Sequence, residues 1–160
     1  MRTKLGAGIL AGLAAGAIFG LMMTMMTAPT PDGGRMPMMG MVAQVVGSDS
    51  LAVGWVYHLF NSAVIGAIFG WFLGRGEVGY GGGLAKGIGY GIFWWILGGQ
   101  ILMPVFLGME PFAALRMAPM RPVAIMSLAG HVVFGGILGL VYAWLRGAET
   151  AGGVERATLA

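Results

Sequence analysis

The sequence predicts an all-α integral membrane protein with four transmembrane helices, and three observations support this fold class. Only 9% of the 160 residues are charged, whereas soluble domains carry about 25%. The hydrophobic fraction is 58% and the mean hydropathy is +0.83. Four apolar stretches reach the roughly 20 residues that a helix needs to cross a bilayer. We therefore expect a single membrane domain over residues 1–160, with almost no soluble part.

The first predicted span begins at Leu5, after Arg2 and Lys4, and continues to Ala28. The apolar run is longer than the core of a secretory signal peptide, so we expect an uncleaved helix. Its glycines recur every fourth residue, at Gly8, Gly12, Gly16 and Gly20. This spacing is typical of helices that pack closely against one another in lipid.

The segment from Pro29 to Ser50 interrupts the apolar pattern. Its prolines and glycines predict a loop, and the methionine-rich run after Pro37 predicts a short helix at the membrane interface. A second span is expected over 51–73. The stretch from Gly76 to Gly83 is then predicted to form a glycine-rich turn.

The third span is expected over 84–103, where Pro104 should end it. A short helical segment opened by Pro111 follows. Pro119 and Pro122 then introduce a fourth span that continues to about Trp144. The second half of the chain therefore repeats the order of the first half, with a short helix before the histidine-bearing span.

An internal repeat is also visible in the residues themselves. Placing His58 on His131, an offset of 73, superposes small residues on small residues, and the first and third spans align with an offset of 71. We expect two tandem helical hairpins, over about 5–75 and 79–147, and a flexible tail over 148–160. Each hairpin has two spans, so both have the same orientation and form a parallel repeat. The residues expected to mediate helix packing are Gly12, Gly16, Gly20, Ser62, Gly66, Gly70, Gly87, Gly91, Gly135, Gly139 and Ala143.

The basic residues predict the orientation of the chain in the membrane. Six lie on the side of the termini, at Arg2, Lys4, Arg75, Lys86, Arg146 and Arg156, and three lie on the other side, at Arg35, Arg116 and Arg121. By the positive-inside rule both termini are cytoplasmic, and the protein is expected in the cytoplasmic (inner) membrane. The short helices then lie on the outer face. Because these charges are scattered, no nucleic-acid partner is expected.

Four short motifs carry a resemblance to a protein family. They are AGLAAG in the first span, GWVYH in the second, LMP at the end of the third and HVVFGGILGLVYAW in the fourth. Together they resemble an uncharacterised family of small four-helix integral membrane proteins of bacteria and archaea, distantly like the YagU-type inner-membrane proteins. The resemblance covers most of the chain from Leu5 to Trp144. It implies four helices with cytoplasmic ends and no catalytic residues.

The two histidines, His58 and His131, are the sharpest candidates for a binding site because both fall at membrane depth. An ionisable side chain inside a membrane is costly and is a functional-site hypothesis by default. One hypothesis makes them the axial ligands of a b-type haem. The alternative is that each neutral histidine only forms a hydrogen bond between helices. Its partners would then be Asn61, Ser62, Ser127 or Gln100.

Methionine is unusually frequent, with 14 residues, and a copper site is a second hypothesis. Thioether groups select Cu(I), and the histidines could share the site. The alternative is that methionine serves as a flexible apolar filler. The candidate ligands besides His58 and His131 are Met36, Met38, Met39 and Met41.

Several classes of chemistry find no support in the sequence. There is no cysteine, which excludes disulfides, cysteine-based metal sites and covalent haem attachment. No G-x-S-x-G motif and no carboxylate within a span is present. We therefore expect a non-enzymatic accessory or scaffolding subunit that packs against itself or a larger membrane complex. The alternatives are a bis-histidine haem protein for electron transfer and a small channel or copper transporter.

Overall fold

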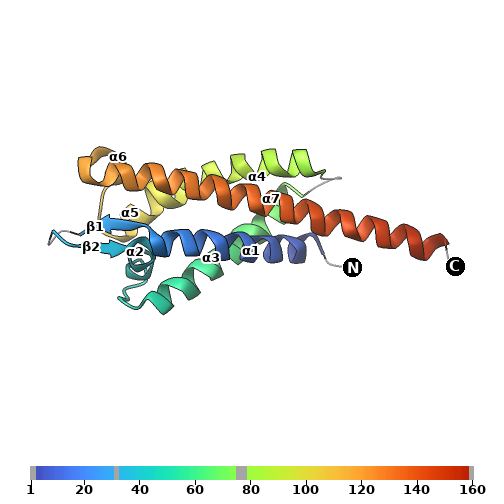
Figure 1. The fold of residues 1–160 in the computed structure, drawn as a ribbon, viewed down its shortest axis with the longest axis horizontal. Coiled ribbons are helices and arrows are strands. Elements are labelled where there is room, and N and C mark those ends of the chain that lie inside the picture. The colour runs from blue at the N-terminus through green and yellow to red at the C-terminus, as the bar shows by residue number, and fades with distance from the viewer. Residues whose placement is uncertain (1–2, 31–32, 75–78, 159–160) are drawn as a thin grey trace.

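The fold consists of four long helices that run side by side (Figure 1). The computed structural model describes residues 3–30, 33–74 and 79–158, with side chains up to Gly147. The helices are α1 (Lys4–Met25), α3 (Leu51–Phe72), α4 (Tyr80–Trp94) and α7 (Arg121–Thr158). A π-helix, η1 (Trp95–Leu102), and a short helix, α5 (Met103–Phe106), continue α4. Four helical segments are long and apolar enough to cross a membrane, which is compatible with the predicted helical membrane protein.

One end of the bundle carries all the short elements, and we call it the β-hairpin end. It holds the antiparallel strands β1 (Thr27–Pro29) and β2 (Arg35–Pro37) and the helices α2 (Met38–Gln44), α6 (Ala113–Arg116) and η2 (Ala118–Met120). Both chain termini lie at the opposite end, which we call the termini end (Figure 1). The predicted short helices are present. The strand β2 was expected to be loop, whereas most of β1 was expected to belong to the first span, which was predicted to reach Ala28 but ends at Met25. Three-residue strands next to prolines are too short to show an alternating pattern in the sequence.

Two predicted boundaries of the third span are wrong. The helix α4 begins at Tyr80, within the stretch that was expected to be a turn. Its glycines Gly83 and Gly87 lie directly against α7, so helix packing overrides their low helix propensity. At the other end, Pro104 does not stop the helix, because the carbonyl of Gln100, four residues before it, accepts a hydrogen bond from the N–H of Phe112 instead.

The helix α7 continues to Thr158 and thus through most of the segment that was expected to be a flexible tail. Flexibility of this tail stays a prediction, since a helical backbone does not measure motion. Arg2, Arg75 and Glu77, which flank the predicted spans, lie outside the described residues, as do positions 31–32 of the predicted loop.

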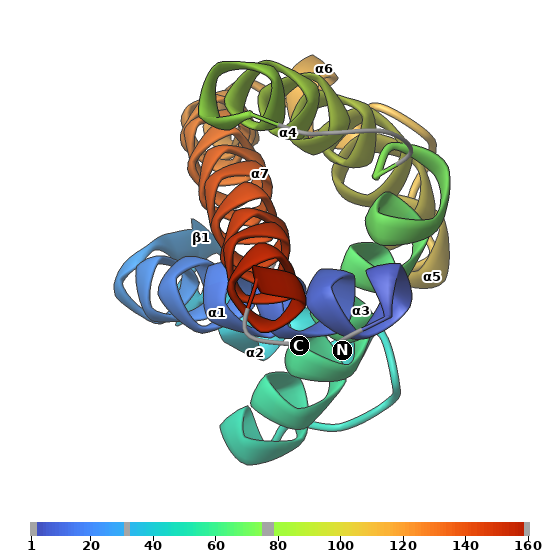
Figure 2. The ribbon, with the colours of Figure 1, turned by 90° about the vertical axis from the view of Figure 1, so that its right-hand side faces the viewer.

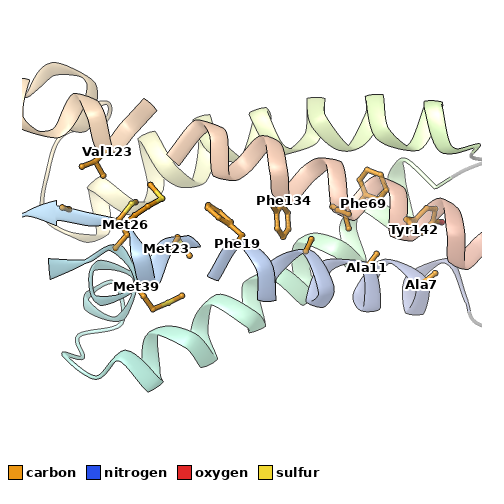
Figure 3. Packing of buried hydrophobic residues seen from close by; sticks show 14 of the residues in the cluster. Ala7, Ala11, Phe19, Met23, Met26, Met39, Phe69, Val123, Phe134 and Tyr142 are labelled. Atoms are coloured by element: carbon orange, nitrogen blue, oxygen red, sulfur yellow. The ribbon is translucent and has the colours of Figure 1, made fainter. Parts of the chain in front are cut away.

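Helix packing follows the order α3, α1, α7, α4. The closest helix contacts join α1 to α3 and α4 to α7, and α1 also packs on α7. Figure 2 shows α7 between α4 and α1, while α3 crosses the bundle and meets α4 at the contacts of Tyr90 with Ile65 and Phe69. In Figure 3 the buried aromatic residues Phe19, Phe69, Phe134 and Tyr142 follow one another along the contact between α1 and α7.

Glycines make the contacts within each helix pair, because a Cβ atom at these positions would overlap the backbone of the neighbouring helix. On α1, Gly8 and Gly12 lie against Gly66 of α3, while Gly20 faces the ring of Trp55. These contacts are formed within one chain. The remaining predicted packing residues lie at the same two contacts, with Gly16, Ser62 and Gly70 in the first pair and Gly87, Gly91, Gly135, Gly139 and Ala143 in the second.

The contacts in the two pairs correspond, but with a different alignment from the predicted one. Gly8 lies against the carbonyl of Gly66, and Gly83 lies against the carbonyl of Gly139. The positions 8 and 83 differ by 75, whereas the sequence suggested an offset of 71 for these helices. A glycine at every fourth position lets two alignments four residues apart match equally well, and only the contacts distinguish them.

Candidate functional site

The aromatic ring of Phe19 lies beside both histidines. His58 belongs to α3, His131 to α7 and Phe19 to α1, which packs on both of those helices. The ring centroids of Phe19 and His58 are 5.7 Å apart, and those of Phe19 and His131 are 4.8 Å apart. Both pairs are edge-to-face, with interplanar angles of 76° and 69°. The structure therefore brings the two predicted histidines to a shared aromatic neighbour from the third helix.

Each histidine donates a hydrogen bond to a backbone carbonyl. His58 Nε2 lies 2.9 Å from the carbonyl oxygen of Gly16 on α1. His131 Nδ1 lies 2.8 Å from the carbonyl oxygen of Ser127 in its own helix. A ring nitrogen that faces a carbonyl must carry the proton, so the other nitrogen of each neutral ring is an acceptor. The predicted interhelical hydrogen bond is present for His58, with a backbone partner in place of a side chain.

This arrangement does not fit a haem held by both histidines. Both imidazoles would have to present a nitrogen to the two faces of one iron. Instead, the side chain of Phe19 packs edge-to-face on each ring, and His58 Nε2 is engaged by Gly16. Phe19 itself is only 5% exposed and also contacts the ring of Phe134, so it belongs to the packed core between α1 and α7.

A cavity of about 280 Å³ lies next to the histidines, in the half of the bundle nearer the β-hairpin end. Its wall combines residues from α1, α2, α3, α7 and the continuous segment η1–α5. Most lining side chains are apolar. The residues of the wall that carry polar groups are Tyr57, His58, Asn61, Ser62, Trp94, Gln100, Ser127 and His131. A mostly apolar cavity with a few convergent polar groups is the usual form of a small-molecule site, although this volume lies just below the range of about 300–1,000 Å³ typical of such sites.

Two residues of this wall each bury a side-chain polar atom that has no hydrogen-bond partner in the part of the chain that the structure describes: the donor Nε1 of Trp94 and the acceptor Oε1 of Gln100. Gln100 is only 1% exposed. A buried amide oxygen without a partner costs about 1–3 kcal/mol. Such oxygens are uncommon in native proteins, and a hydrogen-bond donor on a molecule bound in the cavity would satisfy this one.

The local backbone around Gln100 is also unusual. It lies in the π-helix η1, and π-helical segments occur frequently at functional sites. Its backbone carbonyl accepts a hydrogen bond of 2.6 Å from the N–H of Phe112, which has a φ of +63°. A bulky residue in this left-handed region costs on the order of 1–3 kcal/mol. Trp95 Nε1 donates to the carbonyl of Ala124 at 3.1 Å and fixes η1 against α7. The backbone at Gln100 thus combines a π-helix with a hydrogen bond from a residue in the left-handed region, and the bond of Trp95 fixes this segment beside α7.

The four methionines of the copper hypothesis lie in different surroundings. Met38 lines the cavity, and Met39 is fully buried. Met36 lines a second hollow of about 640 Å³ at the β-hairpin end, and Met41 lines both. Among the described residues there is no group of three or more histidine or acidic side chains that could hold a metal ion. The distribution of these four methionines favours their role as apolar filler.

Comparison with family models, with curated proteins and with solved structures finds no match for this chain. The resemblance to the four-helix family therefore stays a prediction. The residue that sequence reasoning undervalued is Gln100, which was considered only as a partner of the histidines. The sequence did show an uncharged amide in the middle of an apolar span. That its Oε1 lacks a partner among the described residues depends on the π-helix, which no pattern in the sequence predicted.

Proposed function

We propose that this chain is a non-enzymatic protein of the cytoplasmic membrane whose cavity holds a small molecule. The observation that carries this proposal is the fully buried Gln100, whose Oε1 has no partner among the described residues, on the wall of a mostly apolar cavity. The cost of this unpaired oxygen is recovered when a ligand supplies the missing donor. Two histidines and two serines on the same wall offer further polar contacts.

The proposed orientation places the termini end in the cytoplasm and the β-hairpin end outside. Four apolar helices and two termini at one end support this arrangement (Figure 1). Lys4, Lys86 and Arg146 are close to the termini end in sequence, and Arg35, Arg116 and Arg121 belong to the segments at the other end. By the positive-inside rule, these basic residues place the termini end in the cytoplasm. Single-cysteine variants test it: a membrane-impermeant maleimide should label Thr30→Cys in intact cells but Lys86→Cys only after lysis, and the opposite pattern contradicts the orientation.

We further propose that the two helix pairs form a parallel repeat. The glycine contacts between α1 and α3 correspond to those between α4 and α7, which supports this proposal. Each pair begins and ends at the termini end, as a parallel repeat with an axis along the membrane normal requires. The cavity then lies near the β-hairpin end, where the two repeats diverge.

Ligand binding can be tested by analysis of the purified protein in lipid nanodiscs. Native mass spectrometry should detect a retained small molecule that differs from the bulk lipid. Ala124 lines the cavity and is 2% exposed, so Ala124→Phe should fill the cavity and release that molecule. The neighbouring Ile125 is 64% exposed, and Ile125→Phe is the matched control that should retain it. Equal retention by both variants, or no retained molecule in the wild type, would contradict the proposal.

An accessory role in a larger membrane complex is the second candidate. Its contact surface would be the exposed row on α3, where Val56 is 71% and Phe60 is 63% exposed, on a helix whose main partners are α1 and α2; without a partner this row faces lipid. A photoreactive amino acid placed at position 60 should then crosslink to a specific partner in native membranes. Crosslinking to lipid alone would contradict the accessory role.

A further inference from the structure

On the side of the cavity between α3 and η1–α5, the two walls make few contacts with each other. Towards the termini end, α3 and α4 are joined because Tyr90 Oη donates to the carbonyl of Ile65 at 2.9 Å and the rings of Phe69 and Tyr90 lie 5.3 Å apart. Nearer the β-hairpin end, within the described residues, no hydrogen bond joins α3 to η1 or α5. The cavity occupies this part of the bundle.

The residues on both sides of this opening are apolar and exposed. Val64 of α3 is 41% exposed, Leu102 of η1 is 39% exposed, and Phe106 of α5 is 62% exposed. All three also line the cavity and belong to helical segments that are apolar enough to cross a membrane. Exposed apolar residues at this depth face lipid, so the opening connects the cavity to the interior of the bilayer.

The polar wall of the cavity offers hydrogen-bond acceptors and, in Trp94 Nε1, a buried donor without a partner among the described residues. Gln100 Oε1 has no partner in the described part of the chain. The protons of both histidines are directed to the carbonyls of Gly16 and Ser127, which leaves His58 Nδ1 and His131 Nε2 as the acceptors of the neutral rings. The side-chain amide of Gln100 also carries two donors. A hydroxyl group, which donates one hydrogen bond and accepts others, suits this set better than a carbonyl or an ether, which only accept.

We propose that the cavity binds the polar end of a membrane-soluble hydroxyl compound, an alcohol or phenol with an apolar body, which enters from the bilayer between α3 and α5. The hydroxyl donates to Gln100 Oε1. The apolar body lies against the aliphatic and methionine side chains of the wall and extends past Val64 and Phe106 into lipid. The cavity of about 280 Å³ accommodates the polar end but not a long chain, which is why the chain remains in the membrane. This inference rests on the proposed small-molecule site and names its ligand class and its route.

The test compares three photoreactive probes in nanodiscs: a long-chain alcohol with a diazirine in its chain, its methyl ether, and the matching alkane. The alcohol should label peptides of α3 and η1–α5 about ten-fold more strongly than the ether, because only the alcohol can donate to Gln100. Gln100→Leu should reduce labelling by the alcohol to the level of the ether. The melting temperature of this variant without ligand should rise, because the unpaired amide is gone. Lower labelling combined with a lower melting temperature would indicate a merely structural role and overturn the assignment.

Two further outcomes separate the parts of this inference. Equal labelling of the cavity by alcohol, ether and alkane would leave a small-molecule site but refute the hydroxyl assignment. No cavity labelling by any probe, together with no effect of Ala124→Phe, would refute the proposed function as well.

The entry route is tested separately. Val64→Trp should slow labelling by the alcohol, whereas Met117→Trp, in the second hollow, should not. The reverse result would refute entry from the bilayer.

Discussion

The glycine contact between α4 and α7 gives the most direct test of the packing, through the pair Gly87→Ala and Gly89→Ala. Gly87 is buried, and a Cβ added there would overlap the carbonyl of Gly135. Gly89 lies two residues further along the same helix and is exposed, with nothing within 4 Å of an added Cβ. The two substitutions are chemically identical, so their difference isolates the helix contact.

The expected magnitude follows from the backbone overlap. At Gly87 the neighbouring atoms are backbone, so the helices must separate by about 1 Å, and a gap of 0.5–1 Å already loses about a quarter to a half of each van der Waals contact. Insertion of a methyl group into a tight contact costs about 1–3 kcal/mol. At Gly89, replacement of a helical glycine by alanine should stabilise the helix by about 0.5–1 kcal/mol. This gain in helix propensity is common to both variants, so we expect Gly87→Ala to be less stable than Gly89→Ala by about 1–3 kcal/mol.

The assay is reversible unfolding in mixed detergent micelles, with circular dichroism as the readout and the wild type as reference. Gly87→Ala should fall below the wild type and Gly89→Ala should equal or exceed it. Equal stability of the two variants would refute the contact between Gly87 and Gly135. It would also remove the support that the glycine contacts give to a parallel repeat.

Three other outcomes follow from the site. Phe19→Ala should lower the free energy of unfolding by about 3–5 kcal/mol in the same assay, because it empties the space beside both histidines; a loss below 1 kcal/mol would contradict this packing. Tyr90→Phe should cost about 0.5–1.5 kcal/mol through its lost bond to Ile65, whereas the exposed Tyr80→Phe should cost nothing measurable. Purified protein mixed with haem should show no Soret band that depends on His58 and His131, and a histidine-dependent band would show that the rings can rearrange around iron.

The sequence predicted the features that depend on composition along a single helix. The four apolar segments were visible because a run of roughly 20 predominantly apolar residues matches the thickness of a bilayer core. The start of α4 at Tyr80 was missed because its glycines are weak helix formers until they pack against α7. The π-helix was missed because Gly98, Gly99 and Gln100 fit a regular α-helix equally well in the sequence.

The candidate site was predicted only in part, because it depends on which helix faces meet. Each histidine could be placed at membrane depth from its position in its span. The sequence could not show that Phe19 would lie beside both, because that contact joins residues of three helices. The glycine alignment was ambiguous for a related reason, since a four-residue spacing allows equivalent matches one helical turn apart.

The tight glycine contacts hold α1 against α3 and α4 against α7, and α1 packs on α7 between the two pairs. Gly130 of α7 lies at that contact, and a Cβ there would overlap the ring of Phe19, which also lines the cavity. Gly130→Ala should therefore displace Phe19 and weaken ligand binding, although Gly130 does not itself line the cavity. If Gly130→Ala retains the bound molecule as well as Ile125→Phe does, the cavity does not depend on the position of Phe19.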